Sequence, residues 1–250
     1  PWNGMYSYVA RQAILDQNKE LFGYELLFRN GKNNCYPDVE PDEATSKLLV
    51  ENHLSLGIDE ITDSNRAFIN FYEDTLLYRF PTSLDPKTTV IEVLEYVPIS
   101  DALLEACKNI KEQGYTIALD DHDFDPKWDK FLPYADIIKI DIRDHSVDTI
   151  RENIQKYLGA GTTLIAEKVE TIEEFEIFKD MGFHLFQGYF FSVPEIVKTR
   201  KIPPSKLNLI QLIGASASKV MNFDEVNDII ERDVSLSYKL LRFINSPLNN

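Results

Sequence analysis

The middle of the chain alternates short apolar runs with amphipathic stretches of helical period. Strands are expected at 66–71, 88–94, 115–119, 136–140, 162–166 and within 184–191. Helices are predicted over 101–113, 144–158 and 172–181, and Gly114 and Gly182 should end the first and the third of them. Strands that are apolar along nearly their whole length are typical of parallel strands buried on both faces, so the pattern indicates an α/β fold.

A closed barrel and a doubly wound open sheet both produce this alternation, and the strand ends distinguish them. Polar side chains stand at or near these ends: Asn70, Glu92, Asp120, Asp121, Lys139, Glu167 and Gln187. In a (βα) barrel all the carboxyl ends meet at one mouth, where the chemistry takes place. A doubly wound sheet has a crevice at one switch point and would not gather so many strand ends. The expected fold is therefore a TIM-like (βα) barrel.

The pattern changes after Pro194. The breaker cluster KIPP at 201–204 is followed only by helical patterns, over 207–221, 223–230 and 234–244. We therefore expect two domains, a barrel over residues 1–200 and the first part of an all-α domain over 201–250.

Composition narrows the classes of function. The net charge is −15, with 26 Lys and Arg against 41 Asp and Glu, which argues against broad binding to DNA, RNA or anionic lipid. Cys35 and Cys107 form no metal-binding or redox motif, and no apolar run approaches the length of a membrane span. We expect a cytoplasmic protein with reduced thiols and with neither DNA nor a membrane among its partners.

Acidic side chains would crowd together at the predicted mouth. They are Glu25, Glu92, Asp120, Asp121 and Glu167. Crowded carboxylates either raise their pKa values or bind metal, and an all-oxygen set to which Asn70 adds an amide suits Mg²⁺ or Mn²⁺. Two such ions about 4 Å apart support phosphodiester hydrolysis, and Lys139 could orient the attacking water or hold phosphate. Taken singly, each acid could be a solvated loop residue or a helix cap.

Seven short motifs occur in a fixed order between Tyr8 and Pro194. They are GYELLFR at 23–29, FIN at 68–70, IEVLE at 91–95, ALDD at 118–121, KID at 139–141, AEKVE at 166–170 and QGYFF at 187–191. Together they resemble the signatures of EAL domains, the phosphodiesterases specific for cyclic di-GMP, with Leu26 in place of the usual alanine.

This resemblance implies a role for each matched residue. Metal ligands would be Glu25, Asn70, Glu92, Asp120, Asp121 and Glu167, with Asp121 bridging two ions of Mg²⁺ or Mn²⁺. The catalytic set would be Glu25, Lys139 beside the attacking water, and Gln187, which holds that water or a ligand group. Arg29 would contact a substrate phosphate, Glu95 would brace the loop after Asp121, and Asp141 and Glu170 would support the ligands from behind. The product would be linear pGpG.

Two departures from the family pattern bear on activity. The glycine-rich loop after the Asp pair, which in the family couples dimerisation to metal and substrate binding, is replaced by HDFDPKW at 122–128, and Lys168 replaces a glycine. His122 is expected to be a surface loop residue rather than a metal ligand. Three functions stay open: an active phosphodiesterase, a weak or inactive barrel that binds cyclic di-GMP and signals through the helical domain, and a scaffold that ignores the nucleotide. Homodimer formation also stays open.

The segment RDVSLSYKLLRFINS at 232–246 resembles the opening of an HDOD domain, a helical output module that follows EAL domains. The YELLFR variant at 24–29 is typical of EAL–HDOD proteins of the YuxH-like type. This resemblance implies protein partners through the HDOD domain and a role in bacterial second-messenger signalling.

Overall fold

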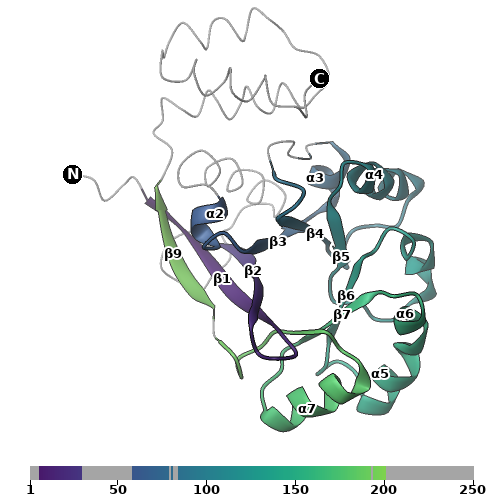
Figure 1. Ribbon diagram of the computed structural model, residues 1–250. Helices are drawn as coiled ribbons and strands as arrows, with labels where there is room; N and C mark the ends of the chain where they lie inside the picture. The colour runs from purple at the N-terminus through teal and green to yellow at the C-terminus, as the bar shows by residue number, and fades with distance from the viewer. Residues whose placement is uncertain (1–5, 30–57, 79, 81–83, 193, 201–250) are drawn as a thin grey trace, which may run out of the picture.

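The computed structural model describes residues 6–29, 58–78, 80, 84–192 and 194–200 (Figure 1). Across these ranges eight strands pair in chain order and close into a barrel, because β1 bonds to both β2 and β8. They are β1 (Tyr6–Asp16), β2 (Leu21–Arg29), β3 (Arg66–Phe71), β4 (Thr89–Val93), β5 (Thr116–Leu119), β6 (Ile137–Asp141), β7 (Thr163–Glu167) and β8 (Leu185–Phe186). The predicted TIM-like barrel is therefore confirmed, whereas the predicted all-α region over 201–250 lies outside the described residues.

Strand β1 runs opposite to the rest of the described barrel. Neighbours from β2 to β8 are parallel, but β1 is antiparallel to both β2 and β8. The cause is a short connection, in which the Asp16 carboxylate accepts the N–H groups of Asn18 and Glu20 and closes a hairpin into β2. A further strand, β9 (Glu195–Arg200), pairs antiparallel with β1. Strands β1, β2 and β9 are not among those predicted from the sequence.

Helices cover the outside of the barrel (Figure 1). They are α2 (Ile58–Ile61), α3 (Glu73–Leu77), α4 (Asp101–Glu112), α5 (Val147–Asn153), α6 (Gln155–Gly159) and α7 (Ile172–Met181), with a 3₁₀ helix η1 (Pro126–Phe131). Ser100 caps α4 by accepting the N–H of Leu103, and a capping box of Thr171 and Glu174 begins α7, which ends at Gly182 in the left-handed conformation.

Two predicted elements differ from the structure. The single helix expected over 144–158 is two helices, because Ser146 caps the start of α5 and the chain tightens at Ile154, whose carbonyl accepts the N–H groups of both Tyr157 and Leu158. The last strand is only Leu185–Phe186, because the chain turns at Gly188, where φ is 155°. A Cβ at Gly188 would overlap the backbone of Val169, so only glycine lets these two segments approach so closely.

One layer of apolar side chains fills the inside of the barrel. Phe22 of β2 packs against seven buried residues in this layer. They are Ile14, Phe68, Val90, Ala118, Ile137, Ile165 and Leu185. Each of the eight strands therefore contributes one side chain to this layer. Because side chains alternate between the two faces of a strand, the residues two positions further along β3 to β8 also point into the barrel. In β2 an irregularity in the pairing with β1 shifts this alternation, so Tyr24 packs on the outer face and Glu25 points inwards.

The larger part of the core lies between the outer face of the barrel and the helices. Leu103, Cys107 and Ile110 of α4 and Phe175 and Phe178 of α7 are buried there. Burial raises the pKa of the Cys107 thiol to about 12 and keeps it a neutral packing group. None of the described helices has the length and apolar content that crossing a bilayer requires.

His184 should make the fold sensitive to acid. Its Nδ1 accepts the N–H of Leu164 at 3.0 Å, and burial lowers the pKa of His184 below 6.5, so the folded state keeps it neutral. The unfolded chain takes up this proton as the pH falls, which favours unfolding. We expect the free energy of unfolding, measured with urea, to drop between about pH 7.5 and about pH 5.5 by more in the wild type than in H184N, whose amide oxygen accepts the same bond without titrating. An equal drop in both proteins would contradict this role.

Candidate functional site

A ring of polar side chains lies directly above the apolar layer, at the mouth formed by the carboxyl ends of the parallel strands. Asn70, for example, lies two residues beyond Phe68, and Glu92 two residues beyond Val90. In antiparallel β1 the corresponding step runs backwards from Ile14 to Gln12, which pairs with Glu25 of β2. The ring consists of Gln12, Glu25, Asn70, Glu92, Asp120, Lys139, Glu167 and Gln187. The convergence predicted from the strand ends is thus seen in the structure.

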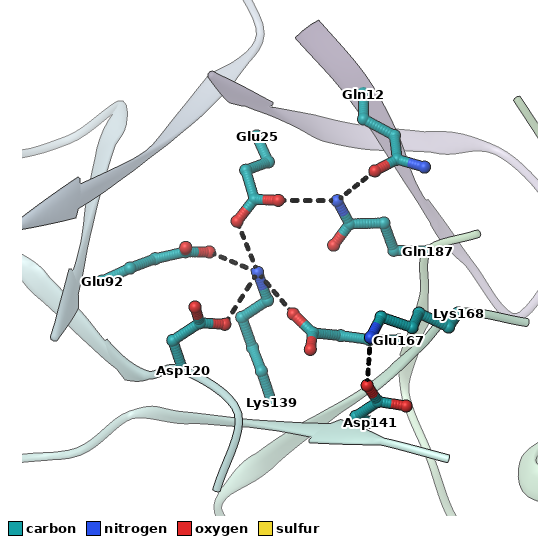
Figure 2. Close-up of polar contacts among 9 residues, drawn as sticks. All are labelled: Gln12, Glu25, Glu92, Asp120, Lys139, Asp141, Glu167, Lys168 and Gln187. Carbon is teal, nitrogen blue, oxygen red and sulfur yellow. Dashed lines mark hydrogen bonds and ion pairs between the residues drawn. The ribbon is translucent and has the colours of Figure 1, made fainter. Parts of the chain in front are cut away.

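Lys139 stands at the centre of this ring (Figure 2). Its side chain is fully buried, and its Nζ lies 2.8 Å from Glu25 Oε2, 2.7 Å from Glu92 Oε1 and 2.8 Å from Glu167 Oε1. A fourth carboxylate, that of Asp120, lies 3.5 Å away. One ammonium therefore faces four acidic groups, and the excess of negative charge leaves the site suited to a further cation.

The ionisation of the ring follows from this imbalance. Burial alone would raise the pKa of Glu25, but the charge of Lys139 and hydrogen bonds from Lys139 and Gln187 lower it to about 2. Burial raises the pKa of both Glu92 and Glu167 well above the usual value, and neighbouring carboxylates add to this. Burial would lower the pKa of Lys139, but the four acids hold it well above its usual value. Glu25 and Lys139 are therefore the firmly charged pair of the site.

Gln187 and Gln12 extend the site on the side of β1 and β8. Gln187 Nε2 donates to Glu25 Oε1 at 3.0 Å and to Gln12 Oε1 at 3.1 Å (Figure 2). Gln12 was not singled out as a site residue, because a lone glutamine in an unrecognised strand carries no local signal. Only the antiparallel pairing of β1 with β2 places Gln12 opposite Glu25.

The described residues fit a divalent ion of the oxygen-preferring kind. The Asn70 Oδ1 and Glu92 Oε2 atoms are buried, and within the described part of the chain no hydrogen bond reaches either of them. Buried polar atoms without partners are rare and call for a ligand. Oxygens of Glu25, Glu92 and Asp120 lie within 4.8 Å of one another, as metal ligands must. Carboxylate and amide oxygens are the donors that Mg²⁺ and Mn²⁺ prefer.

A second acidic group lies at the rim of the mouth. Oxygens of Asp121, Asp141 and Asp144 approach one another within 4.8 Å. Asp141 is buried at the end of β6, where its Oδ2 pairs with Lys168 Nζ at 2.5 Å (Figure 2). The two adjacent aspartates thus face different groups, because Asp120 contacts Lys139 whereas Asp121 lies with the rim acids.

The remaining predicted residues lie at varying distances from the ring. Glu95 is half-buried, and desolvation together with the nearby carboxylates of Asp120 and Asp121 raises its pKa, which places it beside the Asp pair. Glu170 is exposed and forms an ion pair with Arg143 at 2.9 Å. Arg29 is the last residue of β2, and its side chain lies outside the described part of the structure.

The prediction that His122 lies on the surface is wrong. His122 is 3% exposed, its Nε2 is 2.7 Å from the hydroxyl of Tyr157 in α6, and burial lowers its pKa to about 4. Phe124 and Trp128 of the same loop are also buried. The left-handed positions that glycines would favour fall on Asp121 and Phe124, with φ of 43° and 66°. The loop after Asp121 is therefore anchored by its own buried side chains. The burial of His122 depends on Tyr157, which lies 35 residues further along the chain.

Comparison with known proteins agrees with this geometry. The family model of the EAL domain matches residues 43–194. The chain is 42% identical over 246 residues to a protein of Vibrio cholerae named cyclic di-GMP phosphodiesterase CdgJ. This chain belongs to the EAL domain family. It is also 38% identical over 247 residues to YuxH of Bacillus subtilis, an uncharacterized protein. The resemblance to EAL domains drawn from the seven motifs is thereby confirmed.

These matches cover only part of each relative, and the family match covers only part of this chain. Each relative aligns with 97% of this chain, but the chain spans only 57% of CdgJ and 60% of YuxH. The family match begins at residue 43, so Glu25 and Arg29 lie before it. The assignment of Glu25 to the site therefore depends on its contact with Lys139 in the ring. Klebsiella pneumoniae BlrP1, solved as a manganese and cy-diGMP complex, superposes with a TM-score of 0.60 over 78% of this chain and 58% of that one. At 22% identity it supports the fold.

Proposed function

We propose that this EAL domain hydrolyses cyclic di-GMP to linear pGpG with the help of two divalent metal ions, Mg²⁺ or Mn²⁺. The observation that carries the proposal is the buried ring in which four carboxylates surround Lys139 at one barrel mouth. The name of CdgJ, which refers to this activity, supports the choice of substrate.

The ring residues divide the work of such a site. Glu25, Asn70, Glu92 and Asp120 would hold one ion, Glu167 would hold the second, and Asp121 would be the ligand shared by both. Bound ions of this kind supply a hydroxide nucleophile at neutral pH and neutralise the phosphate oxygens. Lys139 offers ammonium N–H donors that orient a water. Arg29 would contact a phosphate of the substrate.

Supporting residues would keep these groups in place. Gln187 holds Glu25 through its amide N–H, while its buried Oε1 has no hydrogen-bond partner among the described residues and is available to a water or a ligand group. Glu95 would brace the loop after Asp121. Asp141 accepts the backbone N–H of Arg143 at 2.9 Å and would support that turn from behind, and Glu170 would do so through Arg143.

A turnover assay tests the proposed function. Purified protein with cyclic di-GMP and either Mn²⁺ or Mg²⁺ is expected to release pGpG, and an excess of EDTA should stop the reaction. Chromatography of the nucleotides over time measures both species. If no pGpG forms with either ion, the catalytic proposal is rejected.

A second candidate is a barrel that binds cyclic di-GMP with little or no turnover and passes a signal to a helical domain. It is favoured by the loop after Asp121, which is anchored by buried His122 and Trp128 instead of following the family's glycine-rich pattern. Small displacements of metal ligands lower rates by orders of magnitude. Calorimetry that shows binding, together with an absence of pGpG in the turnover assay, would select this candidate.

The remaining proposals concern the whole protein. The relatives are longer than this chain, and the helical patterns after residue 200 support an HDOD-like domain that begins over 201–250 and binds protein partners, as in a YuxH-like EAL–HDOD protein. Cyclic di-GMP signalling in the cytoplasm, with or without homodimer formation, would fit the acidic composition and the reduced Cys107.

A further inference from the structure

Lys168 is a second cation built into the mouth, in addition to Lys139. Its backbone has φ of 60°, in the left-handed region that favours glycine. Lys168 directly follows β7, and its Nζ reaches the end of β6, where it pairs with Asp141 Oδ2 at 2.5 Å. Residues Asp141 and Glu167 are themselves partners in the β6–β7 register, so the bond lies beside a proposed metal ligand.

Asp141, the partner of Lys168, is the most buried of the three rim acids Asp121, Asp141 and Asp144, which are called the rim group below. Asp141 is 1% exposed, and its other oxygen accepts the backbone N–H of Arg143 at 2.9 Å. Both oxygens of Asp141 are therefore engaged. Oxygens of Asp121 and Asp144 lie within 4.8 Å of an oxygen of Asp141, so the charge of Lys168 on Asp141 also acts on these two carboxylates.

The two acidic groups consequently differ in their readiness for a metal ion. The deep group, which is the four carboxylates around Lys139, has one ammonium for four acids. Beside it lie buried oxygens of Asn70 and Glu92 that no described residue hydrogen-bonds. The rim group has three carboxylates, and a tethered ammonium already occupies its most buried member. A charge fixed within about 4 Å of a carboxylate changes the affinity of that carboxylate for any other cation.

We infer that Lys168 is a positioning residue whose ammonium, fixed on Asp141, competes with the second divalent ion for the negative charge of Asp121, so that the two ions of the proposed site bind with unequal affinity. The inference rests on the proposed function, because Asp121, a neighbour of Asp141, and Glu167, the residue before Lys168, are the proposed ligands of that second ion. The deep ion would then be held at low metal concentration and the second ion only at higher concentration.

Mn²⁺ titration of the nucleotide-free protein tests this inference, with free Mn²⁺ measured by electron paramagnetic resonance. The wild type is expected to bind one ion tightly and a second at least about tenfold more weakly. K168M removes the charge but keeps the length of the side chain, and it should tighten the second ion about tenfold while leaving the first unchanged. K168R, which keeps the charge, should resemble the wild type. K156M serves as the matched control, because Lys156 pairs with Asp129 on the exposed surface.

The outcomes separate this inference from the proposed function. If K168M leaves the second affinity unchanged or weakens it, or if K168R behaves like K168M, competition by Lys168 is rejected while metal binding stands. Two ions of equal affinity in the wild type would reject it as well. If the wild type binds no Mn²⁺ at all, the two-metal function fails together with the inference. Circular dichroism should show the same fold in all variants, because the Lys168 side chain is 64% exposed.

Discussion

Replacement of Lys139 by methionine is expected to destabilise the metal-free protein by about 3–5 kcal/mol. The ammonium is fully buried and contacts Glu25, Glu92 and Glu167 within 2.8 Å, so its removal leaves buried carboxylates without a counter-charge. Urea unfolding in EDTA measures the loss. Mn²⁺ should restore much of the lost stability, because a divalent ion on the same carboxylates replaces the missing charge.

Activity should not return with stability in this variant. With Mn²⁺ present, K139M should hydrolyse cyclic di-GMP at least about 100-fold more slowly than the wild type, because the ammonium proposed to orient the water is absent. The matched control is again K156M, whose surface ion pair should contribute less than about 1 kcal/mol. Equal stability of K139M and the wild type in EDTA would show that the stability of the ring does not depend on Lys139. If K139M lost Mn²⁺ binding to the same extent as turnover, the assignment of Lys139 to the water would be wrong.

Replacement of Glu25 by glutamine is expected to reduce turnover by at least about 1,000-fold with a change in unfolding free energy of less than about 1.5 kcal/mol. Glu25 has a pKa of about 2, so its carboxylate is charged at neutral pH, and the amide removes that charge at nearly constant volume. The stability change is small because the loss of attraction to Lys139 is offset by relief of Glu92, whose pKa Glu25 raises.

Initial rates of pGpG release and urea unfolding measure the two effects of E25Q side by side. The control is E105Q, which changes an acid on the exposed face of α4 and should alter neither quantity. If E25Q keeps more than about a tenth of the turnover, Glu25 is not a metal ligand. If it unfolds far more easily than the wild type, the carboxylate is structural.

Much of the barrel could be predicted from local patterns. Strand β3 and helix α7 have the predicted bounds, and the bounds of β4 to β7 lie within one residue of theirs, because a strand buried on both faces must be apolar throughout. The hairpin of β1 and β2 carries no comparable signal. Its residues alternate weakly, and its place in the barrel depends on bonds to β8, more than 160 residues away.

The candidate site could also be predicted in part, in the identities of most of its residues. The period-2 alternation that places Phe68 and Val90 in the apolar layer also places Asn70 and Glu92 at the mouth, so the identities of the ring residues on β3 to β8 follow from strand ends. Glu25 was predicted from its motif, and Gln12 was not predicted. The pairing of the ring residues does not follow from strand ends. Which acid contacts Lys139, which aspartate faces the rim and where His122 points are decided by side chains brought together from distant segments.

The sequence by itself therefore determined the fold class, the family and the list of acidic, amide and lysine residues at the mouth, because strand periodicity and motif order are local properties of the chain. Tertiary structure alone decided that Lys139 stands among four carboxylates, that Gln12 belongs to the ring, that His122 is buried against Tyr157 and that Lys168 lies on Asp141. The physical reason is that electrostatic and hydrogen-bond partners are chosen by distance in space, and barrel closure brings together residues that no local pattern relates.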